Sequence, residues 1–195
     1  MDELTVIEAR TLLARAFVDD PLMVWFFPDD RSRVHACAAL FGLFAEHYLA
    51  AGRVDVVRRP HPVALAMWAW PAGGSEPSGE SLPSTSGLMT ALMGADRAAE
   101  LGGEMAVLGE LRPPEPYVHL HLLGVDPDAR RQGLGGQVLE QGLAAARRAG
   151  FIAALETMNP DNVPFYEAHG LTVRQSVQLG RGGPRVWAMA TARNP

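Results

Sequence analysis

The sequence Leu-Gly-Val-Asp-Pro-Asp-Ala-Arg-Arg-Gln-Gly-Leu-Gly-Gly-Gln-Val-Leu at residues 123–139 decides the fold. The apolar residues that precede it predict a strand, and Asp-Pro-Asp predicts a turn. The glycines then open a helix over about 134–149. At such a strand–helix turn successive backbone N–H groups are unpaired and point outward, and the helix dipole adds partial positive charge. The stretch therefore predicts an α/β protein with a phosphate or pyrophosphate site at the start of this helix.

Residues in the same stretch exclude two common types of phosphate site. Arg130 and Arg131 add formal positive charge for an anion. A Rossmann turn would need glycine at the position of Val138, and a P-loop would need a Gly-Lys-Ser/Thr ending that is not present. A plain glycine-rich connection with two solvated arginines remains the alternative interpretation.

Composition sets the broad class of the protein. The chain has 195 residues, of which 48% are hydrophobic and 20% charged, and this balance favours one globular domain. Cys37 is the only cysteine, so no internal disulfide can form. The net charge of −5 gives no bulk electrostatic reason to bind nucleic acid. No 18-residue apolar run and no basic leader are present, so we expect a cytoplasmic protein that neither enters a membrane nor binds nucleic acid.

Helices and strands alternate in the second half, which favours a mixed sheet over a helix bundle. Residues 72–86 are rich in Ser, Pro and Gly and are expected to form a mobile loop. Helices are predicted after Thr5, which has capping-box spacing with Glu8, and over 30–51, 87–111, 134–149 and 162–168. Strands are predicted over 54–58, 63–70, 117–125, 151–157, 171–179 and 185–192.

A second motif, Leu-Glu-Thr-Met-Asn-Pro-Asp-Asn-Val-Pro-Phe-Tyr-Glu-Ala-His-Gly-Leu at 155–171, follows about thirty residues after Arg-Arg-Gln-Gly-Leu-Gly at 130–135. The first motif resembles the Arg/Gln-x-x-Gly-x-Gly/Ala signature of the GNAT superfamily of N-acetyltransferases. The second is similar to that superfamily's asparagine, tyrosine and Glu-x-x-Gly-Phe signature, with Leu171 in place of phenylalanine. The two motifs stand in the family's order and spacing, and together they cover about 120–171.

The resemblance implies a fold and a division of the chain. It implies a mixed, mostly antiparallel central sheet that is splayed between the fourth and fifth strands of the family and flanked by helices. Residues 1–195 would form one domain, in which 1–112 make the acceptor side and 113–195 bind acetyl-CoA. The family's first strand has only residues 4–7 available, so this strand is expected to be short or missing.

The resemblance also implies which residues bind acetyl-CoA, the cosubstrate; no metal is implied. Backbone groups of Leu123, Gly124 and Val125 would pair with its pantetheine arm. Asn159 matches a position that contacts this arm or fixes the following turn, and Asn162 is a rival for the same role. The pyrophosphate would be held by the segment Arg131, Gln132, Gly133, Leu134, Gly135 and Gly136, with Arg130 beside it.

Tyr166 matches the family's general acid, and the chemistry agrees with that role. A phenol with a pKa near about 10 stays protonated at neutral pH and can donate to a leaving thiolate. The backbone N–H of Leu123 is the expected oxyanion donor. His119 and His121 share one strand face and, with Glu156, are the candidate bases. Each of the three could instead be an ordinary structural or surface group.

The predicted function is therefore transfer of an acetyl group from acetyl-CoA to a primary amine by direct attack. The alternative is a non-catalytic acyl-CoA-binding domain on the same fold. The acceptor is expected to be a small molecule or a peptide, and a homodimer is possible. Asp19, Asp20, Asp29 and Asp30 could attract a cationic amine, but helix caps and turns are the favoured interpretation of these residues. An aromatic-walled acceptor pocket is considered for Trp25, Phe26, Phe27, Trp68 and Trp70, although ordinary core packing is favoured for each of them.

Overall fold

The structure, a computed structural model, describes residues 3–71 and 85–193 of the chain. Up to residue 71 it contains α1 (Val6–Phe17), α2 (Pro21–Phe26), α3 (Asp30–Ala51), β1 (Arg53–Arg58) and β2 (Pro62–Ala69). From residue 85 the helices are α4 (Thr85–Met93), α5 (Ala95–Met105), α6 (Val107–Glu110), α7 (Leu134–Arg148) and α8 (Asn162–Glu167), with a short 3₁₀ turn at Pro127–Ala129. The strands of this part are β3 (Tyr117–Val125), β4 (Ile152–Thr157), β5 (Leu171–Gln178) and β6 (Arg185–Thr191).

In the described residues, six strands form one sheet in the order β1-β2-β3-β4-β6-β5. All neighbouring strands are antiparallel except β3 and β4, which run parallel. The prediction of a mixed, mostly antiparallel sheet flanked by helices is confirmed.

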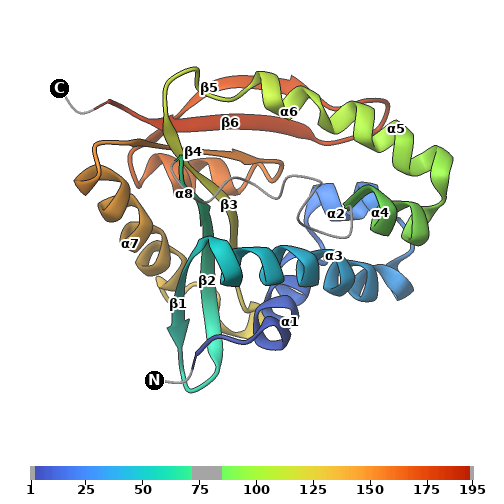
Figure 1. Cartoon of the computed structure of the whole chain (residues 1–195), viewed down its shortest axis with the longest axis horizontal. Helices are drawn as coiled ribbons and strands as arrows, with labels where there is room; N and C mark the ends of the chain where they lie inside the picture. Colours follow the sequence, from blue (N-terminus) through green and yellow to red (C-terminus); the bar gives the residue numbers. More distant parts are fainter. Residues whose placement is uncertain (1–2, 72–84, 194–195) are drawn as a thin grey trace.

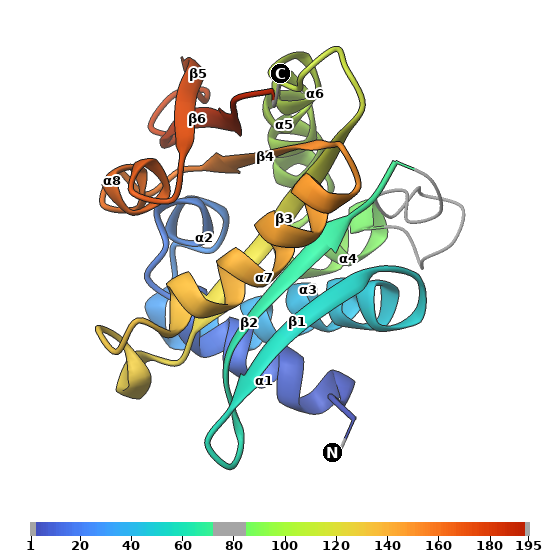
Figure 2. The ribbon, with the colours of Figure 1, turned by 90° about the vertical axis from the view of Figure 1, so that its left-hand side faces the viewer.

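Helices cover both faces of the sheet, as Figures 1 and 2 show for α7 on one side and α1 and α3 on the other. The alternation of side chains along β2 explains this. Leu65 and Met67 pack with α1 and α3, whereas Ala64, Ala66 and Trp68 pack with α7. Because both faces are covered, this strand is apolar along nearly its whole length.

The pairing of β3 with β4 ends early. Tyr117, Val118 and His119 pair with residues 152–154 of β4. Beyond His119 the strands separate, and residues 120–125 of β3 have no partner on β4, although most of them still pair with β2. This is the splay that the resemblance implies, and it leaves one backbone edge of β3 open to a ligand.

Three details differ from the sequence-based expectations. Residues 4–7 form no strand, because Thr5 caps α1 and helical structure begins at Val6; the splayed strands are therefore the third and fourth of this chain. The helix α2 was not expected: Asp20 caps it and Pro21 occupies its first position. Of the predicted loop 72–86, Thr85 and Ser86 belong to α4, and 72–84 lie outside the described residues.

Charged groups hold the start of α1, and they make the stability of the fold depend on pH. Thr5 and Glu8 form a reciprocal capping box, and Arg58 of β1 donates to both oxygens of Glu8 at 2.8 and 3.1 Å. These bonds lower the pKa of Glu8 to about 2, with the Arg58 hydrogen bond as the largest cause.

We therefore expect the Glu8→Gln variant to be less stable than the wild type at neutral pH but equally stable near pH 2. A carboxyl group with a lowered pKa stabilises the fold above its ordinary value, and this contribution disappears as the pH falls through the lowered value. Urea unfolding midpoints at several pH values measure the difference. The exposed Glu46→Gln is the matched control, and an equal deficit of Glu8→Gln at every pH would contradict the expectation.

Candidate active site

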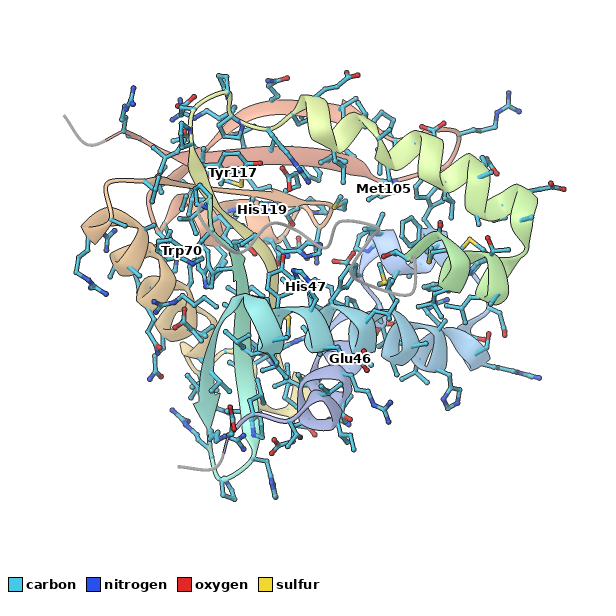
Figure 3. The ribbon with its side chains drawn as sticks, viewed as in Figure 1. Glu46, His47, Trp70, Met105, Tyr117 and His119 are labelled. Carbon is cyan, nitrogen blue, oxygen red and sulfur yellow. The ribbon has the colours of Figure 1, made fainter. Side chains whose placement is uncertain are left out.

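A cavity of about 380 Å³ lies where β3 and β4 separate. The α1–α2 junction, α3, α4 and α5 line it on one side, and β3, β4 and α8 line it on the other. In Figure 3, His119 marks the β3 side of this region and Met105 on α5 marks the opposite side. We call this space the central cavity.

Tyr166 of α8 lines the central cavity and is buried, with 7% of its surface exposed. Its hydroxyl group makes no hydrogen bond with any residue of 3–71 or 85–193. Burial raises the pKa of this phenol well above its usual value, and the negative charge of Asp20 raises it further. The phenol is therefore protonated at neutral pH and can donate a proton into the cavity.

The three candidate bases come together on β3 and β4, on the same side of the cavity as α8. His119 Nε2 lies 2.7 Å from Glu156 Oε2, and both side chains are less than a tenth exposed. The ring of His121 stacks on the ring of His119 with centroids 5.8 Å apart, and its Nδ1 lies 3.0 Å from the Tyr48 hydroxyl. Glu156 and His121 line the central cavity, whereas His119 is behind them. A proton accepted by the Glu156 carboxylate can therefore be shared with a buried imidazole.

The first turn of α7 has the features of an anion site. Arg131 and Gly133 both have a positive φ, 60° and 74°, and this conformation turns successive N–H groups to the same side. No side chain caps the helix, so the first N–H groups of its 15 residues are not satisfied by a cap. Gly136 passes so close to His169 that a Cβ would lie 2.8 Å from His169 Nε2.

The other residues predicted for this segment are placed differently. The Arg130 side chain donates to the Ala16 carbonyl at 2.8 Å, so it ties the loop to α1. The Gln132 side chain accepts a bond from Arg59 at 3.0 Å. Leu134 is buried in the core between α7 and the sheet, so only its backbone is available to a ligand. Arg131 and Gly135 complete the exposed or half-exposed part of the turn.

On β3, Leu123 lines the central cavity on the unpaired edge of the strand. Gly124 has a packing role besides: a Cβ there would lie 3.0 to 3.3 Å from Leu13, Leu12 and Ala16 of α1. Val125 ends the strand and is half-buried. The absence of a side chain at Gly124 therefore lets α1 approach the sheet.

The two asparagines have separate positions. Asn159 Oδ1 accepts from the backbone N–H of Asp161 at 3.0 Å, and its own backbone N–H donates to Thr157. Its side chain thus holds the turn between β4 and α8. Asn162 lines the central cavity, one helical turn before Tyr166, and its amide donates to Thr157 Oγ1 at 3.4 Å.

Asp20 meets both interpretations that the sequence allowed: it caps α2, and it lines the central cavity, where a cationic amine could reach it. Tyr48 of α3 is a residue that the sequence did not assign to the site, and its contact with His121 spans 73 residues. Of the five aromatic residues considered for an acceptor wall, Phe26 alone lines the central cavity. Trp68 is buried on the α7 face of the sheet, and Trp25 packs under Arg97.

Two kinds of feature are absent from the described residues. Within 3–71 and 85–193, no three His, Cys, Asp or Glu side chains are grouped so that they could hold a metal ion. In the same ranges, no helix has the length and apolar character needed to cross a membrane.

Comparison with known proteins connects this geometry to a family. Residues 87–171 match the model of the acetyltransferase (GNAT) family. This segment is a GNAT-family segment. It contains the α7 turn, the splayed strands, Glu156 and Tyr166, and the sheet and helices of the whole chain have the GNAT-type fold. The resemblance to this family is thereby confirmed for residues 87–171, and the expected fold is confirmed for the chain.

Solved structures share this fold, and one curated protein matches part of the sequence. A histone acetyltransferase HPA2-related protein from Corynebacterium glutamicum superposes with a TM-score of 0.70 at 19% identity, covering 100% of this chain and 94% of that one. Arylalkylamine N-acetyltransferase 2 from Aedes aegypti gives a TM-score of 0.59 at 10% identity, covering 99% and 98%. Mycothiol acetyltransferase from Geodermatophilus obscurus is 40% identical over 62 residues, which are 30% of this chain and 20% of that protein. The chain thus matches only a fifth of this curated relative.

Proposed function

We propose that this GNAT-type acyltransferase moves the acetyl group of acetyl-CoA to a primary amine. One observation carries the proposal: the cavity at the splay of β3 and β4 brings together a buried phenol, Tyr166, and a buried carboxylate, Glu156. Direct acyl transfer to an amine needs an acid for the leaving thiolate and a base for the ammonium proton. The two groups lie on β4 and α8, within the segment that matches the GNAT family.

The residues around the α7 turn fit acetyl-CoA. The uncapped helix start and the positive φ of Arg131 and Gly133 suit a pyrophosphate, which accepts hydrogen bonds from successive N–H groups. The unpaired edge of β3 at Leu123 suits the amide groups of a pantetheine arm, which can pair with it as an added strand. When bound, acetyl-CoA would supply the activated acetyl thioester.

Glu156 and Tyr166 have different roles in the proton transfers of this reaction. Glu156 accepts a proton from the ammonium group of the acceptor, and His119 supports the carboxylate through its Nε2. The neutral amine nitrogen attacks the acetyl carbon while the carbonyl oxygen takes hydrogen bonds from the edge of β3, where the N–H of Leu123 is our candidate donor. As the C–S bond breaks, the Tyr166 hydroxyl gives its proton to the sulfur, and the second proton that the nitrogen loses as the amide forms restores the phenol. His121, held by Tyr48, is the rival base.

The first test combines calorimetry and a thiol assay on the purified chain. We expect coenzyme A to bind and free thiol to appear only when acetyl-CoA and a primary amine are both present. Coenzyme A binding without acetylation of any amine in a broad panel would favour the non-catalytic acyl-CoA-binding alternative. No binding of coenzyme A to a folded chain would contradict both functions.

The substitution Gly136→Ala tests the proposed pyrophosphate site. The added Cβ would press on His169, whose Nδ1 is held by the Phe165 carbonyl at 2.8 Å, so the α7 turn or the imidazole has to move. We expect the Kd of coenzyme A to rise about tenfold, equivalent to about 1.4 kcal/mol. Binding of pantetheine, which lacks the pyrophosphate, should be unchanged.

Gly103→Ala is the matched control, because Gly103 also lies in a helix and a Cβ there meets nothing within 4 Å. Removing the imidazole in Gly136→Ala/His169→Ala should restore part of the lost affinity. An unchanged Kd in Gly136→Ala, measured by titration calorimetry, would remove this turn from the coenzyme A site.

A further inference from the structure

The wall of the central cavity that faces the splay is strongly apolar. It is made by side chains from α2, α3, α4 and α5, of which the largest are Phe26, Phe41, Phe44, Met89, Leu101 and Met105. Most of these side chains also belong to the core cluster around α1 and α3, so they are held in place by packing. A ligand that fills this wall must therefore present a hydrophobic body to it.

The volume of the cavity limits the size of that body. About 380 Å³ lies near the lower end of small-molecule sites, which measure roughly 300–1,000 Å³. A folded protein surface or an extended polysaccharide does not fit such a space. A single aromatic or branched aliphatic group with a short arm does.

The charge of the cavity is negative. Asp20 and Glu156 line it, and no Lys or Arg of the described residues does so. Asp20 is fixed at the start of α2, where its Oδ1 accepts from the Leu22 N–H at 2.9 Å. Its charge is close enough to Tyr166 to contribute to the raised pKa of that phenol. A cation bound at Asp20 would therefore lie near Tyr166, the proposed acid.

From these three properties we propose that the acceptor is a primary amine carried by a single compact hydrophobic group, with Asp20 binding its ammonium. This inference rests on the proposed acetyltransferase function and assigns its substrate class. Asp20 and Glu156 then have different tasks, since Asp20 attracts and places the cation and Glu156 removes its proton. The remainder of the acceptor packs on Phe41, Phe44 and their neighbours.

The same wall disfavours other amine classes. A polyamine would place its second ammonium group against apolar side chains, where an unpaired charge is costly. A polar aminoglycoside would leave hydroxyl groups there without hydrogen-bond partners. Both classes are therefore expected to be poor acceptors.

Acceptor competition tests the substrate class. With acetyl-CoA and the full chain, we expect kcat/KM for 2-phenylethylamine to exceed that for ethylamine by about 10–100-fold, as burial of one aromatic ring implies. Spermidine should be no better than ethylamine. In Ala98→Phe, the new ring would occupy the α5 side of the cavity. We expect kcat/KM for 2-phenylethylamine to fall to about that for ethylamine, and kcat/KM for ethylamine to stay unchanged.

Asp20→Asn tests the cation site without removing the helix cap, because asparagine caps helices about as well as aspartate. We expect KM for 2-phenylethylamine to rise about tenfold, the effect of losing about 1.4 kcal/mol, with kcat nearly unchanged. Asp29→Asn is the matched control, since Asp29 caps α3 in the same way but does not line the cavity.

The outcomes separate the two proposals. If spermidine or ethylamine equals 2-phenylethylamine, or if Asp20→Asn keeps the wild-type KM, the inference on the acceptor is overturned and the acetyltransferase function stands. If no amine in a broad panel releases thiol while coenzyme A still binds, the proposed function fails and the inference fails with it.

Discussion

Replacement of Tyr166 by phenylalanine is expected to lower kcat for amine acetylation by about 10²–10⁴-fold, the usual contribution of a positioned general acid. The ring packs in the core between α7 and the sheet, so phenylalanine keeps the packing and removes only the hydroxyl. The Kd of coenzyme A should stay the same, because the pyrophosphate turn belongs to α7. The loss should therefore appear in kcat alone.

Steady-state thiol release and calorimetry on the same preparation measure both quantities. Tyr117→Phe, at the start of β3 and outside the cavity lining, is the matched control. Full activity in Tyr166→Phe would exclude the phenol as the acid. An equal loss in Tyr117→Phe would show that removal of a hydroxyl acts through the fold.

The same substitution changes stability in alkaline solution. The folded chain holds the Tyr166 proton more tightly than the unfolded chain, since burial raises the pKa of this phenol. Stability from this group is therefore complete below a pH of about 10 and decreases as the pH rises above that value. Tyr166→Phe should lack this part of the alkaline decrease.

Local patterns were sufficient to predict much of this fold. The glycine-rich turn before α7 is a short segment whose residue types follow from backbone geometry, whereas the tyrosine motif of α8 was identified through the resemblance to the GNAT superfamily. The placement of His119 and His121 on one face of a strand follows from the alternation of side chains. These predictions needed no contact between distant parts of the chain.

Contacts between distant segments set the rest of the site. His119 meets Glu156 because β3 and β4 pair in parallel with His119 opposite Ala154, a register that neither strand encodes alone. Tyr48 reaches His121 from α3, and Asp20 enters the cavity because α2 turns back after Pro21. A helix cap and a cavity carboxylate look identical in sequence, so the sequence left both interpretations of Asp20 open, and the structure shows that it caps α2 and lines the cavity.

Glu156→Gln is the second large effect that we expect, a decrease of about 10²–10³-fold in kcat/KM near pH 7 within the range for general bases. Glutamine keeps the shape and can still bond to His119, so the variant removes the basic oxygen and little else. An alkylamine with a pKa of about 10.4 is only about one part in 10³ neutral at pH 7. The base is needed because it converts the bound ammonium group to the neutral amine that attacks.

The pH dependence distinguishes a lost base from a disturbed fold. As the pH approaches about 10, the free amine forms without help, so the deficit of Glu156→Gln should shrink toward the wild-type rate. A deficit that stays constant with pH would instead indicate displaced groups. His121→Asn is the decisive comparison, because His121 also lines the cavity. If His121→Asn shows the pH-dependent loss and Glu156→Gln does not, the proton passes to His121 and its Tyr48 contact, and Glu156 only positions His119.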